Sequence, residues 1–178
     1  MPSEIGDGFH RLKGDDVALL RTEPVGRGSW SARIYPGDRP GAVPLTELRI
    51  SLFRSRGGFT LEGEEFSIEP EGFLGTTAVL KKGSTVIARS RKESFFGRRF
   101  RITSAGHGLD LVSRSWRGRS YALLLGNQEV GTLKRAGLGG RRMALELPDE
   151  VPLFLRVFLA YLVLCQGKRE AAAASGGS

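Results

Sequence analysis

The sequence has few of the residues that build metal sites, disulfide frameworks and thiol active sites. Its 178 residues include one cysteine, Cys165, and two histidines, His10 and His107. A single cysteine excludes an intramolecular disulfide and any zinc site with several thiolate ligands. Neither histidine has a second histidine or cysteine at ligand spacing. We therefore expect no metal and no cofactor, and the composition suits a reducing compartment.

A secretory signal and the sequence motifs of common enzymes are also missing. Residues 1–20 contain acids and glycines where a secretory signal has a basic start and an apolar run, which favours a cytoplasmic location. The glycine cluster at 137–140 joins two predicted strands instead of opening a nucleotide-binding helix. Ser104, His107 and Asp110 straddle one turn, and nothing in the sequence orients them as a catalytic triad. We expect no catalytic residues and predict a protein that is not an enzyme.

Short stretches of alternating polar and apolar residues, separated by turn residues, fill most of the chain. This pattern is typical of an all-β domain. A meander of roughly a dozen short strands hides its edges by closing into a barrel or by splitting into two sheets. The predicted strands lie at Val17–Arg21, Trp30–Tyr35, Leu48–Phe53, Phe59–Leu61, Phe66–Ile68, Thr77–Leu80, Thr85–Ala88, Phe100–Ile102, Leu109–Val112, Tyr121–Leu125, Val130–Leu133 and Met143–Leu147.

One apolar segment, Pro152–Cys165, breaks the strand pattern, because it contains no glycine and one charged residue, Arg156. It predicts a helix that Asp149 caps and that ends near Gly167. A helix that is apolar on every face must be surrounded by protein or by lipid. At about 21 Å it is shorter than the roughly 30 Å hydrocarbon core, which favours a buried helix over a membrane anchor. The tail at 170–178 is predicted to be disordered.

Many short strands followed by one hydrophobic helix resemble the layout of the tubby, phospholipid scramblase and LURP-one-related superfamily. The segments Phe59–Leu147 and Leu153–Leu164 fit this order, whereas the first fifty residues fit it loosely. The chain also resembles small, largely uncharacterised bacterial members that end in Leu-Pro-Asp-Glu-x-Pro and an apolar helix, here Leu147–Pro152. The resemblance implies one domain, residues 1–169, in which a closed β-barrel of roughly twelve strands surrounds a central helix at 152–165.

The resemblance also implies a functional class. Eukaryotic relatives include phosphoinositide-binding regulators and membrane-associated scramblases, so binding of lipid head groups is expected. The sequence contains no diagnostic phosphoinositide motif, no acidic calcium loop and no cluster of cysteines for palmitoylation. No role of an individual residue is therefore carried over from the superfamily, and the fold analogy favours lipid only modestly.

The net charge of +8 is concentrated in the middle of the chain. Residues 1–80 contain 9 basic and 12 acidic residues, residues 81–142 contain 15 and 3, and residues 143–178 contain 3 and 4. If the strands of the middle segment lie side by side, their outer faces form a positive patch that attracts phosphates. The alternative is an ordinary solvated surface in a protein that uses 21 Arg and 6 Lys.

Two arginine-rich segments that contain aromatic residues are the candidate binding sites. In residues 91–101, the side chains of Phe95 and Phe96 would enter the acyl boundary of a membrane while the cations meet anionic head groups. In residues 114–121, Trp116 would stack on a base or lie at a membrane interface. The alternative for both segments is an aromatic side chain that turns into the core. The candidate residues are Arg91, Lys92, Phe95, Phe96, Arg98, Arg99, Arg101, Arg114, Trp116, Arg117 and Arg119.

The acidic stretch at 62–71 lacks the spacing of a calcium loop, so we expect it to solubilise a hairpin or to meet the basic strands. The sequence thus favours a non-enzymatic binding or scaffold module, cytoplasmic and peripheral at the membrane, whose partner is an anionic phospholipid or membrane surface. A protein-interaction or structural module without a specific small ligand is one alternative, and a binder of single-stranded nucleic acid is another.

Overall fold

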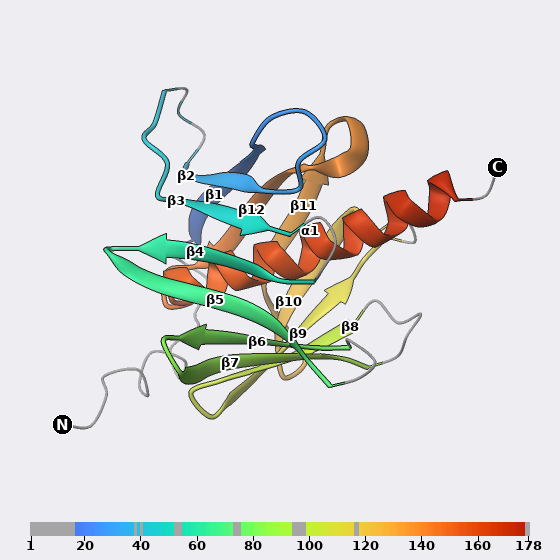
Figure 1. Cartoon of the computed structure of the whole chain (residues 1–178). Helices are drawn as coiled ribbons and strands as arrows, with labels where there is room; N and C mark the ends of the chain where they lie inside the picture. Colours follow the sequence, from blue (N-terminus) through green and yellow to red (C-terminus); the bar gives the residue numbers. More distant parts are fainter. Residues whose placement is uncertain are drawn as a thin grey trace.

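A computed structural model describes residues 17–37, 39, 41–51, 55–72, 76–93, 99–115 and 118–176. Each strand pairs with its neighbours in the chain, and β1 pairs with β12, so the sheet is a closed antiparallel barrel (Figure 1). The strands are β1 (Val17–Pro24), β2 (Ala32–Pro36), β3 (Thr46–Ile50), β4 (Gly57–Leu61), β5 (Glu64–Glu71), β6 (Thr77–Lys82), β7 (Thr85–Lys92), β8 (Arg99–Ser104), β9 (His107–Ser113), β10 (Ser120–Leu125), β11 (Gln128–Ala136) and β12 (Arg142–Pro148).

The alternation of side chains in each strand explains why the sheet closes around an apolar interior. In β8, Phe100 and Ile102 are buried while Arg101 and Thr103 are exposed. Residues two positions apart share a face of the sheet, so one face of each strand joins the core. Each predicted strand corresponds to an observed one, and the barrel, rather than two sheets, is the observed solution. Closure leaves the sheet without an unpaired edge.

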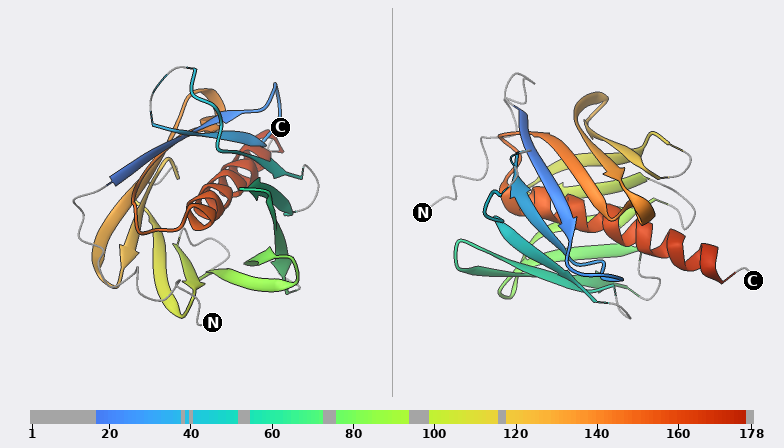
Figure 2. Two further views of the ribbon diagram at one scale, coloured as in Figure 1. Left: turned by 90° about the vertical axis from the view of Figure 1, so that its left-hand side faces the viewer. Right: turned by 90° about the horizontal axis from the view of Figure 1, so that it is seen from above.

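The helix α1 (Leu153–Ser175) fills the barrel (Figure 2). Seen along the barrel, the helix lies inside the ring of strands. Leu155, Phe158, Leu159 and Leu164 are fully buried. A helix that is apolar on every face is therefore covered by protein on every side, as the sequence predicts.

The cap of the helix and its C-terminal end differ from the sequence prediction. The helix does not end near Gly167 but continues to Ser175, so the part of the predicted disordered tail up to that residue is helical. The run at 171–174 consists of alanine, the best helix former, and it extends the helix beyond the barrel. At the other end, Asp149 does not cap the helix, because Pro152 is the N-cap and no side chain caps it. Asp149 instead accepts a hydrogen bond from Arg156 at 3.4 Å.

Arg156, the charged residue within the apolar run, closes the turn between β12 and α1. Its guanidinium group donates to the carbonyl oxygens of Val151 at 2.6 Å, Pro148 at 3.0 Å and Asp149 at 2.7 Å. Backbone oxygens thus satisfy a buried cation whose neighbours in the sequence are apolar.

Candidate functional site: the end of the barrel where the helix leaves

Because the strands alternate in direction, every second connection lies at the same end of the barrel. The connections β1–β2, β3–β4, β5–β6, β7–β8, β9–β10 and β11–β12 share one end, which we call the exit end. The helix leaves the barrel there, as shown by hydrogen bonds from Lys168 to Ser51 and from Lys92 to Gln166. Both predicted binding segments are connections at this end, β7–β8 and β9–β10. Segments that the sequence offers as separate candidates therefore belong to one face of the molecule.

The connections at the two ends differ in charge. Among the described residues, those at the exit end carry one acid, Glu93, whereas those at the opposite end carry one arginine, Arg39, and three acids. The positive charge of the described connections thus lies at the exit end, next to Lys168 and Arg169 of α1. The described arginines of the exit-end connections are Arg27, Arg56, Arg114, Arg119 and Arg141. The described acids at the opposite end are Glu62, Asp149 and Glu150.

Trp30 is the one aromatic residue that the structure describes in the exit-end connections, and it is partly buried against the core. The aromatic residues of the two predicted binding segments, Phe95, Phe96 and Trp116, lie outside the described residues.

The structure describes six of the eleven predicted binding residues. Arg91, Arg101, Arg114 and Arg119 are exposed, and Arg99 is half-buried. The sixth, Lys92, is buried. The other candidates, Phe95, Phe96, Arg98, Trp116 and Arg117, lie outside the described residues.

The outer wall of the barrel is largely neutralised by its own acids. Lys82 pairs with Glu64 at 2.6 Å, and Arg89 pairs with Glu71 at 2.8 Å. The hydrogen bond from Lys81 holds the pKa of Glu69 below its usual value. The acidic stretch therefore meets the basic strands, as one of the sequence interpretations proposes.

Three of the predicted binding arginines are also paired. Arg99 and Arg101 share Asp110, at 2.8 and 3.4 Å, and Arg114 pairs with Glu129. The hydrogen bond to Asp110 raises the pKa of Arg99, which stays charged. Because acidic partners compensate their charges, these three arginines attract an anionic ligand less strongly than the sequence suggests.

Cations without an acidic partner are concentrated at the exit end. In the part of the chain that the structure describes, Arg27, Arg91, Arg119 and Arg142 are exposed there and form no ion pair. Sequence reasoning named Arg91 and Arg119 but missed the other two. They lie outside the two arginine-rich segments, and only the alternation of strand directions places them on the same face.

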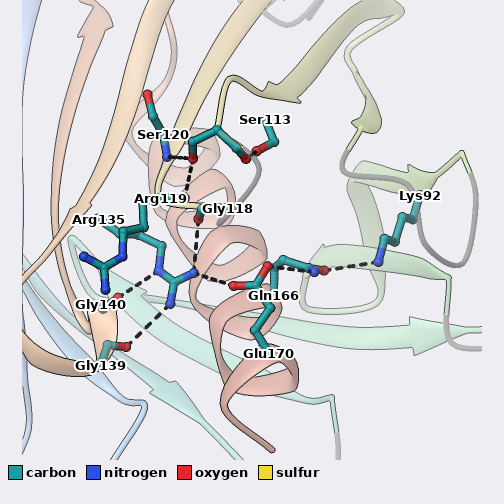
Figure 3. Close-up of polar contacts among 11 residues, drawn as sticks. Lys92, Ser113, Gly118, Arg119, Ser120, Arg135, Gly139, Gly140, Gln166 and Glu170 are labelled. Atoms are coloured by element: carbon teal, nitrogen blue, oxygen red, sulfur yellow. Dashed lines mark hydrogen bonds and ion pairs between the residues drawn. The ribbon is translucent and has the colours of Figure 1, made fainter. Parts of the chain in front are cut away.

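Lys92 was expected to face a membrane, and this prediction is wrong. Its side chain is 8% exposed and lies inside the barrel, where it donates to Gln166 Oε1 at 3.1 Å (Figure 3). The reason is the alternation along β7, in which Ala88, Ser90 and Lys92 face inward while Arg89 and Arg91 face outward. The same alternation was readable in the sequence.

Gln166 belongs to a chain of polar contacts that ties α1 to the barrel. Its Nε2 donates to Glu170 at 3.3 Å, and Glu170 accepts from Arg135 of β11 at 3.0 Å (Figure 3). Arg135 also donates to the carbonyl oxygens of Gly118 and Gly140, at 3.1 and 2.9 Å. The side chain of Arg135 is 6% exposed, so this ion pair is shielded from solvent on the arginine side. The network fixes the helix against the wall at the exit end.

A hollow of about 560 Å³ lies along β3, β4 and β5, and its lining extends from Ser51 at the exit end to Gly83 in the β6–β7 connection at the opposite end. Gly58 leaves this wall open, and Arg49, Arg56 and Ser67 line it. Glu65 also lines the hollow. The volume is in the range of small-molecule sites. Sequence reasoning did not identify it, because Arg49 and Arg56 belong to the acidic first part of the chain.

Other side chains of interest do not form a reactive site. Asp110 binds two arginines and Ser104 donates to the carbonyl oxygen of Ile87 at 3.0 Å, so Ser104, His107 and Asp110 are not arranged as a relay. Burial raises the pKa of Cys165 to about 11, which keeps the thiol protonated at neutral pH. No group of three potential metal ligands occurs among the described residues.

Comparisons with protein-family models, with curated proteins and with solved structures gave no match to this chain. Among the described residues, no helix has the length and apolar character needed to cross a bilayer. The chemistry of the exit end therefore has to be interpreted from its own residues.

Proposed function

We propose that this protein is a non-enzymatic binding module that attaches to anionic phospholipid surfaces by the exit end of its barrel. The observation that carries the proposal is the division of charge between the two ends, since the described connections of the exit end carry five arginines and one acid, whereas those of the opposite end carry one arginine and three acids. Each cation near an anionic surface contributes about 1 kcal/mol, and aromatic side chains settle at the boundary between head groups and acyl chains.

The exposed arginines at this end explain how such a surface would be recognised. Arg27, Arg91, Arg119 and Arg142 come from four different parts of the sheet, so the contact would be a broad ring around the helix. A flat charged surface suits such a ring better than a deep pocket does, and the barrel itself is filled by α1. Attraction of this kind weakens as salt rises.

Flotation with liposomes tests the proposal. The protein should float with vesicles that contain phosphatidylserine, should not float with phosphatidylcholine alone, and should be released by raised salt. The triple variant Arg27→Ser/Arg119→Ser/Arg142→Ser should bind about 100-fold more weakly, at about 1 kcal/mol per charge. The variant Phe95→Ser/Phe96→Ser tests the aromatic contribution in the same assay.

A matched control removes three cations elsewhere, in Arg39→Ser/Lys82→Ser/Arg89→Ser. These residues are exposed, and they lie at the opposite end or in the middle of the outer wall. Equal loss of binding in both triple variants would show that net charge, and not the exit end, determines binding. If the protein does not float with any vesicle but binds a single-stranded oligonucleotide, the ligand is nucleic acid and not lipid. Nucleic-acid bases stack on the same types of residue.

A further inference from the structure

A small cavity lies inside the barrel at the exit end, between α1 and the wall formed by β6, β7 and β8. Its volume is about 30 Å³, and Thr77, Ser90, Lys92, Phe100, Cys165 and Gln166 are among the residues that line it. About 10–15 Å³ of such volume accommodates one water molecule. The cavity therefore admits one or two small guests, such as a water molecule or a monatomic ion, and it excludes a phosphate group.

The polar side chains of the cavity include one that lacks a partner. Ser90 is 1% exposed, and its hydroxyl group forms no hydrogen bond within the described chain. A buried hydroxyl without a partner costs free energy, so such groups usually meet a bound water or ion. Ser90 lies two residues from Lys92 on the inner face of β7, and both line the cavity. The hydroxyl and the ammonium group thus border the same space.

The charge of the lining distinguishes an anion from a cation. Lys92 and Arg169 are the charged residues among the described lining, which contains no aspartate or glutamate. Gln166 presents its Oε1 to Lys92 and directs its Nε2 toward Glu170, so its amide separates the ammonium group from that carboxylate. A positive charge in a protein interior favours a bound anion more strongly than it does in water.

We propose that this cavity binds one small inorganic anion, with chloride as the abundant candidate. The ion would accept hydrogen bonds from Ser90 Oγ and from the Lys92 ammonium group. The bound ion would join β7 to α1 next to the contact between Lys92 and Gln166. Its site is inside the barrel and does not depend on membrane binding.

Thermal unfolding at constant ionic strength tests the proposal with the full chain. The melting temperature should rise saturably as chloride or bromide replaces methanesulfonate, which is too large for the cavity. The expected rise is about 2–4 °C when the halide is present at about five times its Kd. In Ser90→Ala and Lys92→Met the halide-specific rise should be lost, whereas Lys134→Met, which removes an exposed lysine of β11, should keep it.

The variants remain informative if one of them does not fold. Should Lys92→Met be unstable, Ser90→Ala keeps the charge and still removes an anion contact. Crystals grown in bromide should show an anomalous peak between Ser90 and Lys92. Equal melting temperatures in halide and methanesulfonate, or a halide effect that Ser90→Ala and Lys92→Met retain, would overturn the proposal and leave a cavity that holds water only.

Discussion

At the scale of single residues, the contact between Arg135 and Gly167 explains a glycine in the middle of a helix. A Cβ atom built on Gly167 would clash with Nη2 of Arg135, and one built on Gly140 would lie 2.8 Å from the same atom. The two glycines thus make room for a guanidinium group that reaches Glu170. Glycine lowers the stability of a helix by up to about 1 kcal/mol relative to alanine. At position 167, the missing side chain leaves space for the ion pair between Arg135 and Glu170.

This contact predicts non-additive effects of substitution. Gly167→Ala should destabilise the protein by about 1–3 kcal/mol, because the methyl group overpacks the site. In an Arg135→Met background, the flexible methionine side chain can move aside, and the same change should become neutral or stabilising by up to about 1 kcal/mol. Urea unfolding of the wild type, both single variants and the double variant measures the coupling. Additive free energies would contradict the assigned contact.

The sequence predicts which way a side chain points when the alternation of inward and outward residues is followed along a strand. The prediction for Lys92 was wrong because this alternation was not applied to it. Lys92 was grouped with its basic neighbours, although it shares a face with Ala88 and Ser90. Arg27 and Arg142 were missed for a different reason. Their position at the same end of the barrel as Arg119 depends on the directions and order of strands that are far apart in the sequence, which no local pattern reveals.

At the scale of elements, the helix and the strands were predictable to different degrees. Turn residues and alternation located every strand, because each strand is a local pattern bounded by glycine or short polar turns. The start of the helix was placed within a residue, but its end was not. Glycine commonly ends a helix. Gly167 instead lies inside this helix, because Arg135 occupies the space that a side chain at position 167 would need.

The role of α1 as the filling of the barrel predicts a large effect of a buried charge. Leu159→Asp should abolish cooperative folding or destabilise it by more than about 4 kcal/mol, because Leu159 is fully buried and no cation replaces the lost apolar contacts. The matched control, Ala173→Asp, places the same charge on the exposed part of the helix and should change stability by less than about 0.5 kcal/mol. Circular dichroism during urea unfolding measures both. A soluble Leu159→Asp variant with unchanged melting would contradict a helix inside the barrel.

At the scale of the whole molecule, the alternation of strand directions determines how charge is divided between the two ends of the barrel. Basic residues spread over the middle of the chain become partly paired on the outer wall, where Glu64, Glu69 and Glu71 meet Lys82, Lys81 and Arg89. Among the described residues, the unpaired cations that remain lie mainly at the exit end, in its connections and in the adjoining ends of the strands. Net charge alone does not show where these cations lie, whereas the topology brings the exposed Arg27, Arg91, Arg119 and Arg142 to the end of the barrel where the helix leaves.

This polarity predicts the orientation of the protein on a membrane. In a Cys165→Ala background, a fluorescent label at Ala173→Cys lies beyond the exit end, and a label at Asn127→Cys lies in the β10–β11 connection at the opposite end. Both positions are exposed. On phosphatidylserine vesicles that contain a lipid quencher, the label near Ala173 should be quenched and the label near Asn127 should not. The reverse order, or equal quenching at both positions, would mean that the arginines at the exit end do not face the bilayer, because a contact made by one end must bring that end closer to the lipid.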